Sequence, residues 1–149
     1  MPTLMRQINV ISRCAGIYRT DQLRGTDLHA CHHSYVLTIC RHPGISQEEL
    51  SHHIYINKSN VTRHLAYLET HDYVIRSQSE TDKRVMLVYP TQKMLNVLPD
   101  IKRITGEWNE YLTAEFSDQE LNQFRSMLDR IADRAKKYVD DKEEQKICE

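Results

Sequence analysis

Apolar residues recur at helical spacing along most of the chain, and they alternate with polar residues in only one region. In the middle of the chain, Ser46 and Glu49 form a capping box, which predicts a helix from about Gln47. Asn57 is a favoured N-cap residue, so a second helix is predicted to begin directly after it. The inward positions of this second helix, at i, i+4 and i+7, are Val61, Leu65 and Leu68.

The region of alternation follows this second helix and predicts a two-stranded hairpin. Residues 73–79 alternate cleanly and residues 84–89 less so, and a polar tip separates them. Lys83 and Arg84 near this tip are placed to reach phosphates or to enter a minor groove. Asp82 is expected to orient the Arg84 guanidinium by a charge-assisted hydrogen bond. Two short helices and a hairpin form the pattern of a winged helix-turn-helix, and they make DNA the first partner to consider.

The outward face of the second helix fits that partner, because its side chains near the N-terminus are small, hydroxylic, amidic or basic. Such side chains allow a helix to lie deep in a major groove and to bond base edges or phosphates. The wheel also turns Ala66 and Tyr67 outward. The residues predicted to contact DNA are Lys58, Ser59, Asn60, Thr62 and Arg63 on the helix, and Asp82, Lys83 and Arg84 on the hairpin.

Residues 46–91 resemble the DNA-binding core of the MarR family of bacterial regulators. The resemblance rests on Gly44–Leu50, Asn57–Arg63, Leu68-Glu69 and Asp82-Lys83-Arg84, of which the last matches the family's Asp-x-Arg wing signature. Two departures are visible. Asp72 stands where the family usually has glycine, a mild change because Asp tolerates left-handed backbone. Residues 90–94 replace the usual Leu-Thr-x-x-Gly.

The flanking segments read as helices, and the resemblance implies that the first and last helices interlock two subunits. Residues 4–24 form a first helix, and Asp27 is expected to cap a second over 28–41. After the hairpin, a helix capped by Thr91 runs to about Phe116, with Pro99 marking a kink or a late start. Ser117–Glu120 is another capping box. The seam behind it contains Leu121, Phe124, Leu128, Ile131, Ala135 and Tyr138, and it is suited to packing on a partner.

The predicted fold class is therefore mainly α with a small β wing, in one MarR-like domain over residues 1–149. Its parts are a winged-helix DNA-binding core at 27–91, dimerisation helices at 1–25 and 92–139, and an acidic tail at 140–149. The predicted function is a sequence-specific transcriptional regulator. It is a homodimeric repressor on a pseudo-palindromic operator, with half-sites about 10 base pairs apart, released by a small-molecule signal. The alternative is a winged-helix module that binds protein instead of DNA.

Composition narrows the function classes. The net charge of −1 and pI near 6.7 lack the basic signature of many DNA binders, although the acidic tail masks a less acidic remainder. No stretch is apolar enough for a membrane span or a signal peptide, so a cytoplasmic protein is expected. The cysteines, at 14, 31, 40 and 148, have no zinc or disulfide spacing and are expected to be reduced. No catalytic motif is present, and neither an enzyme nor a cofactor is predicted.

The signal that the regulator senses stays open between several candidates. A small phenolic or anionic effector is expected near Tyr18, Arg19, His29, His33 and Trp108. Cys14, one turn before Tyr18, resembles the sensing cysteine of the family's hydroperoxide-responsive branch. His29 and His33 share a helix face beside Cys31 and His32, an arrangement able to bind a metal, but the sequence offers no clear third ligand and no metal site is predicted. Constitutive DNA binding without a ligand is the remaining possibility.

Overall fold

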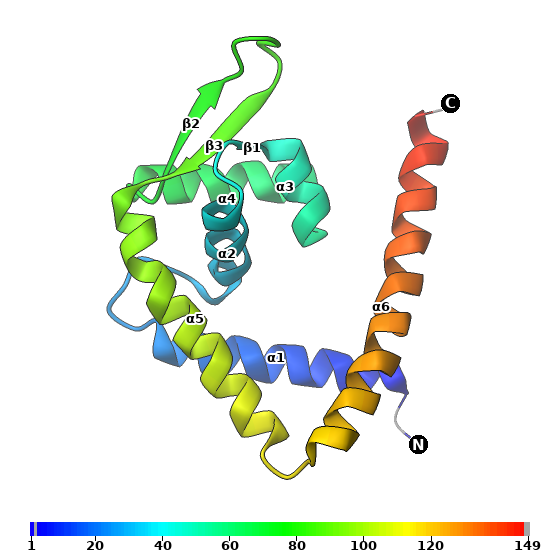
Figure 1. Cartoon of the computed structure of the whole chain (residues 1–149). Coiled ribbons are helices and arrows are strands. Elements are labelled where there is room, and N and C mark those ends of the chain that lie inside the picture. The colour runs from blue at the N-terminus through cyan, green and yellow to red at the C-terminus, as the bar shows by residue number, and fades with distance from the viewer. Residues whose placement is uncertain (2, 148–149) are drawn as a thin grey trace. The chain divides into compact units, whose positions relative to one another are not determined.

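The computed structural model describes residue 1 and residues 3–147, with side chains as far as residue 143. Its contacts divide the chain into two compact units, Met1–Trp108 and Asn109–Glu149. Helices dominate, and one small sheet lies in the first unit (Figure 1). The elements are α1 (Leu4–Gln22), η1 (Ala30–His32), α2 (His33–Arg41), β1 (Ile45–Ser46), α3 (Gln47–Ile54), α4 (Lys58–Thr70), β2 (Val74–Gln78), β3 (Met86–Pro90), α5 (Gln92–Thr113) and α6 (Asp118–Ile147). The predicted class, mainly α with a β wing, is confirmed.

The helix predicted over 28–41 begins later than expected. Asp27 does not cap it, because its carboxylate accepts a hydrogen bond from Lys93 at 3.2 Å and its carbonyl accepts one from the Tyr67 hydroxyl at 2.8 Å. The first turn is instead the 3-10 helix η1, with a capping box between His29 and His32. The prediction was wrong because the contacts of Asp27 come from residues distant in sequence.

The turn between α3 and α4 forms as predicted. The side chain of Ser46 caps α3, and Glu49 closes the capping box. Tyr55 ends α3 in a left-handed conformation with φ 53°, and the Asn57 side chain caps α4 by accepting the backbone N–H of Asn60 at 2.9 Å. The inward residues Val61, Leu65 and Leu68 are fully buried. The two helices are therefore fixed by local caps and by one shared core.

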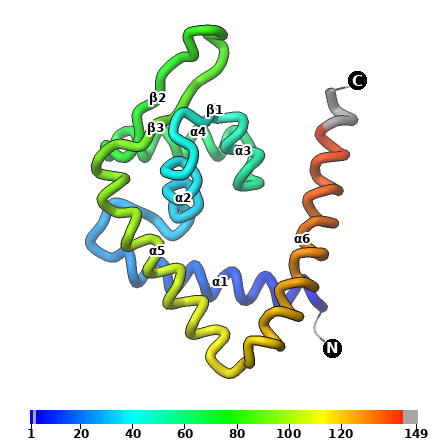
Figure 2. Tube along the Cα trace, viewed as in Figure 1, coloured from blue at the N-terminus to red at the C-terminus, as the bar shows by residue number. Residues whose placement is uncertain are grey.

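The wing has three strands, where the sequence predicted two. The sheet is antiparallel with the order β1-β3-β2, and Ile45 of the additional strand β1 pairs with Val88 of β3. Figure 1 shows the hairpin of β2 and β3 extending beyond α3 and α4, and Figure 2 traces its tip as one open loop. Asp72, at φ 62°, adopts the left-handed conformation expected at the usual glycine position before β2.

A single apolar core holds the first unit together. Its members come from the segment after α1 and from α2, α3, α4, α5 and all three strands; the fully buried side chains include Tyr35, Ile39, Leu50, Leu65, Met94 and Val88. Thr91 caps α5 by accepting the Met94 N–H at 3.3 Å. Pro99 lies inside α5, which already starts at Gln92, so the late start considered from the sequence does not occur.

The second unit is dominated by the single helix α6. The Ser117–Glu120 capping box is present, with the Ser117 N–H donating to Glu120 at 2.9 Å. The helix continues into the acidic segment that begins at Asp140, and the helix itself ends at Ile147. Of the predicted seam, Phe124, Leu128, Ile131 and Tyr138 are exposed. None of the described helices is both long enough and apolar enough to span a membrane.

Candidate nucleic-acid interface

The N-terminal half of α4 presents a polar surface. Lys58, Ser59, Thr62 and Arg63 are exposed, and Asn60 is half-buried. Their hydrogen bonds are mostly local: Arg63 donates to the Asn60 side chain at 3.0 Å, and Thr62 donates to the Lys58 carbonyl at 3.0 Å. Lys58 forms an ion pair with Glu48 of α3, which holds the pKa of that carboxyl below its ordinary value. Side chains held in this way keep donors and acceptors available for an incoming base or phosphate.

Tyr67, which the helical wheel placed outward, belongs to the interior edge of α4. Its hydroxyl donates to the Asp27 carbonyl, and its ring stacks on His32 with centroids 5.2 Å apart and on His71 at 4.1 Å. The outward face of α4 is therefore narrower than the wheel predicted.

The tip of the wing presents a guanidinium held in a fixed orientation. Arg84 donates from its Nε and one Nη to the two carboxylate oxygens of Asp82, each at 3.1 Å. The backbone N–H of Arg84 also donates to this carboxylate, at 3.0 Å. These hydrogen bonds lower the pKa of Asp82 and raise the pKa of Arg84. The Arg84 side chain is nevertheless 90% exposed. The Asp82 carboxylate thus positions the charge as the sequence predicted, without removing it from solvent, and Lys83 is exposed beside it.

A partly buried network that the sequence reasoning missed connects the wing to the helix-turn-helix. Arg76 of β2 donates to Glu69 of α4 at 2.7 and 3.1 Å, and to the Gln47 side chain of α3 at 3.3 Å. Gln47 in turn donates to Thr62 at 3.4 Å. The bond from Arg76 is the main cause of the lowered pKa of Glu69. The only feature of the sequence that pointed to this network was the Leu68-Glu69 pair. This pair is part of the family resemblance but does not indicate a hydrogen-bond partner for Glu69. This network joins β2 of the wing to both α3 and α4.

Comparisons with known proteins agree with this geometry. Residues 30–86, which include η1, α2, the helix-turn-helix and the wing as far as the first residue of β3, match the MarR family model. The chain belongs to the MarR family of winged-helix regulators. The uncharacterized HTH-type transcriptional regulator YybA of Bacillus subtilis is 24% identical over 131 residues, covering 88% of this chain and 87% of YybA.

Solved structures extend the likeness to nearly the whole MarR-family chain. A MarR transcriptional regulator from Methanosarcina mazei is 27% identical with a TM-score of 0.84, over 90% of this chain and 96% of that protein. A MarR family transcriptional regulator from Listeria monocytogenes, solved in complex with a 26mer DNA, is 25% identical with a TM-score of 0.85. That match covers 92% of this chain and 91% of the Listeria protein.

The residues proposed for an effector pocket in this MarR-family chain lie in several places. Tyr18 stacks on Trp108 with centroids 4.8 Å apart and donates to Glu107 at 3.4 Å. Burial lowers the pKa of Arg19, whose Nε is buried without a hydrogen-bond partner among the described residues. Burial first, and then the charge of Arg19, lowers the pKa of His33. His29 instead stacks on His32, at 5.1 Å. The ring contact therefore joins Tyr18 to Trp108, while the charge of Arg19 acts on His33.

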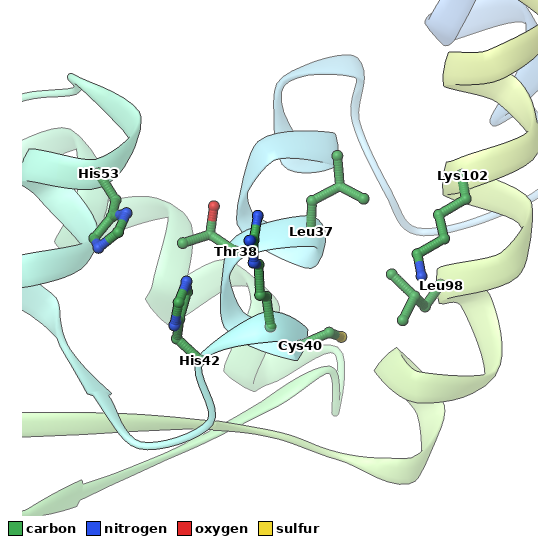
Figure 3. Close-up of a pocket in the computed structure, with 8 residues that line it drawn as sticks. Leu37, Thr38, Cys40, His42, His53, Leu98 and Lys102 are labelled. Atoms are coloured by element: carbon green, nitrogen blue, oxygen red, sulfur yellow. The ribbon is translucent and has the colours of Figure 1, made fainter.

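A cavity of about 600 Å³ lies elsewhere, between α2, α3 and α5. Figure 3 shows its lining, which contains none of the five predicted effector residues: Leu37, Thr38, Cys40, Arg41, His42, His53, Leu98 and Lys102. The histidine rings of His42 and His53 lie 5.2 Å apart at its edge. No pattern in the sequence indicated this cavity, because α2, α3 and α5 contribute to it from separate stretches.

Among the described residues, Cys14, Cys31 and Cys40 are free cysteines, and Cys148 lies outside those residues. Cys14 is exposed on α1, whereas Tyr18, its predicted partner, donates to Glu107. Burial raises the pKa of the Cys31 and Cys40 thiols. In the histidine-rich segment, the Nδ1 of His33 lies 3.0 Å from the Ala30 carbonyl, and His32 is fully buried against His64 of α4.

Proposed function

We propose that this chain is a dimeric, sequence-specific DNA-binding regulator that acts as a repressor and is released by a small ligand. The observation that carries the proposal is the exposed Arg84 guanidinium, fixed by Asp82 at the tip of the wing next to a helix with a small, polar outer face. A guanidinium has five N–H donors. The side-chain bonds to Asp82 use two of them, which leaves the others for phosphate or minor-groove acceptors.

On the helix, we propose that Ser59, Asn60, Thr62 and Arg63 read or position base edges, while Lys58 contacts phosphate. The Arg76–Glu69–Gln47 network supports this proposal because it fixes the wing relative to α4, so both reach one duplex in a constant register. Lys83 would add a phosphate contact beside Arg84. Sequence discrimination would come from α4, whose outer face carries the hydroxylic, amidic and basic side chains that bond base edges.

Homodimerisation is supported by apolar surface that a single chain leaves exposed. Leu4, Val10, Ile11 and Ile17 of α1, and Phe124, Met127, Leu128 and Tyr138 of α6, are each at least 38% exposed. A monomer rarely leaves so many large apolar side chains in water. We therefore propose that residues 1–25 and 92–139 join two subunits while residues 27–91 bind DNA. Two copies of α4 would then enter successive major grooves about 10 base pairs apart.

Repression follows most simply if a compact dimer bound to a promoter blocks polymerase. The protein would do this in the cytoplasm, where the DNA is. We propose a phenolic or anionic effector near Arg19 and His33, because the buried Nε of Arg19 lacks a hydrogen-bond partner within the part of the chain that the structure describes, and an anion would supply one. The stacked pair of Tyr18 and Trp108 would offer an aromatic wall. The effector would act by shifting the population between DNA-competent and DNA-incompetent dimers. Oxidation of Cys14 is the alternative signal.

The test is fluorescence anisotropy of the reduced, metal-stripped protein with the DNA upstream of its own gene and with a scrambled duplex, at two salt concentrations. We expect tight, salt-sensitive binding that favours the upstream DNA. Addition of a phenolic acid, and of peroxide to separate samples, then identifies the releasing signal. Equal, weak binding to both duplexes, repeated with a library of genomic fragments, would contradict the proposal and favour a protein-binding module.

A further inference from the structure

Three metal-ligating side chains from distant parts of the sequence meet between η1 and α4. The Nε2 of His32 lies 3.2 Å from the Nδ1 of His64, and the Sγ of Cys31 lies 3.9 Å from the same nitrogen. All three ligand atoms lie within 4.8 Å of one another. We propose that Cys31, His32 and His64 bind one Zn²⁺ ion, or a divalent cation of similar borderline softness.

Two of the three separations between these ligand atoms match a tetrahedral centre. Zinc–nitrogen bonds of about 2.05 Å and a zinc–sulfur bond of about 2.3 Å place two nitrogens about 3.3 Å apart and a sulfur about 3.6 Å from a nitrogen. The two observed separations differ from these values by a few tenths of an ångström. The third separation, between the Cys31 Sγ and the His32 Nε2, is at most 4.8 Å. A rotation of the exposed Cys31 side chain would therefore complete the geometry, and no new element has to approach.

The donor set selects the class of metal. One thiolate and two imidazoles favour Zn²⁺ and related borderline cations over Mg²⁺ or Ca²⁺, which prefer oxygen ligands. Three protein ligands leave the fourth position for water. On binding, a zinc–sulfur bond forms, the S–H bond of Cys31 breaks, and the proton passes to solvent. Because Cys31 is exposed and His64 is half-buried, the ion has a route to the fully buried His32.

The tautomer of His32 links metal binding to the start of α2. The His29 backbone N–H donates to the Nδ1 of His32 at 3.0 Å, so a neutral His32 ring carries its proton on Nε2, facing His64. A metal at Nε2 displaces that proton, and the neutral ring then holds one on Nδ1. Such a ring no longer accepts the His29 N–H. Metal binding therefore opens the His29–His32 hydrogen bond that caps η1.

The site also connects two elements whose relative position matters for DNA binding. His64 lies on α4, beside Arg63, whereas Cys31 and His32 lie in η1 before α2. A bound ion would hold α4 against η1, and on the proposed function it would change DNA affinity. By reciprocity, DNA would change metal affinity by the same factor. This last step alone rests on the proposed function, since metal binding itself needs no DNA.

The experiment uses tag-free, full-length, reduced protein from which metal has been stripped. Zn²⁺ is titrated against a chromophoric chelator, and Co²⁺ is added separately so that its absorbance reports on thiolate and on tetrahedral ligation. We expect one ion per chain, a thiolate-to-cobalt charge-transfer band, and release of one proton. Cys31→Ser and His64→Gln should each lower affinity by more than the roughly 10–100-fold that loss of an outer-shell partner costs.

Matched controls are Cys14→Ser and His53→Gln, which change the same residue types outside the cluster and should leave affinity unchanged. His32 is fully buried, so amide hydrogen exchange tests its role without a substitution. We expect the His29 amide to exchange faster in the zinc-bound protein. The proposal is overturned if no ion binds, if either cluster variant binds like the wild type, if the controls lose affinity equally, or if His29 exchange is unchanged at saturating zinc. Zinc binding without any DNA binding would leave the site standing and contradict only the proposed function.

Discussion

The winged part of the chain and α6 contain similar apolar residues but place them differently. Val61, Leu65 and Leu68 recur along α4 and are fully buried in the core. Phe124, Leu128 and Ile131 recur at the same kind of spacing along α6, yet they are exposed, Phe124 to 56%. An identical pattern thus serves an internal core in one region and an open surface in the other. The difference indicates that the first region folds on its own contacts, while the exposed apolar residues of α6 fit the dimer interface that we propose.

Truncation of a leucine in the core of the winged part should have the largest effect on the free energy of unfolding. Leu65→Ala is expected to lower the free energy of unfolding by about 2–5 kcal/mol, because it removes fully buried methyl groups and leaves a cavity. Leu95→Ala changes a leucine that is 41% exposed on α5 and should cost under about 0.5 kcal/mol. Urea denaturation followed by circular dichroism measures both. Equal losses would show that the core assigned to the winged part is wrong.

Charge on the α6 seam should affect assembly rather than the winged core. Leu128→Glu combined with Phe124→Glu is expected to weaken dimerisation by roughly 2 kcal/mol or more, about 30-fold in the dissociation constant, because both would place a carboxylate in an apolar interface. Ser126→Glu adds the same charge to the opposite face of the helix and should leave the constant unchanged. Sedimentation equilibrium measures the effect. A dimer that survives the double substitution would contradict the comparison.

A change on the outer face of α4 should affect recognition and leave both the core and the dimer intact. Arg63→Ala is expected to cost roughly 1–3 kcal/mol against operators that carry the preferred base at one position in each half-site. Variant operators in competition binding reveal that position. A uniform loss across all sequences would instead assign Arg63 to phosphate.

The smallest predicted effect concerns the network between wing and helix. Arg76 lowers the pKa of Glu69, so this pair stabilises the fold above the unfolded carboxyl pKa of about 4.3, and the contribution is lost as the pH falls through the lower folded value. Glu69→Gln is expected to lose roughly 1 kcal/mol at pH 7, since the pair is partly exposed, and to approach the wild type below about pH 4. Denaturation at both pH values checks this prediction. Asp82→Asn should not change stability, because its partner Arg84 is almost fully exposed.

The features that could be predicted from the sequence are those encoded within a few residues. The Ser46 and Ser117 capping boxes, the Asn57 cap and the Asp82–Arg84 pair each depend on neighbours two or three positions away. The missed features depend on distant partners. Strand β1 exists only because Ile45 pairs with Val88, and the role of Asp27 is set by Lys93 and Tyr67.

The dependence on distant partners also explains why the contacts of the histidine-rich segment and the Arg76 network were not predicted. By their spacing, His29 and His33 were the histidines best placed to share a metal ion. The 3-10 turn instead directs His32 toward His64, and no local pattern reveals this contact because the two residues are 32 positions apart in the sequence. Arg76 and Gln47 meet across 29 residues. Side-chain chemistry therefore indicated the kind of surface on α4 and the wing, while the fold determined which residues support it.

The most direct test of DNA binding by the wing is the salt dependence of DNA affinity for the wild type and Arg84→Ala, measured by anisotropy on one operator. The control is Lys142→Ala, which removes an equal charge from α6, where the Lys142 ammonium lies over the Tyr138 ring. We expect Arg84→Ala to bind more weakly and to lower the slope of log affinity against log salt by about 1 for each Arg84 that contacts phosphate. The control should keep both the slope and the affinity. An unchanged slope and affinity in a folded Arg84→Ala protein would contradict the account.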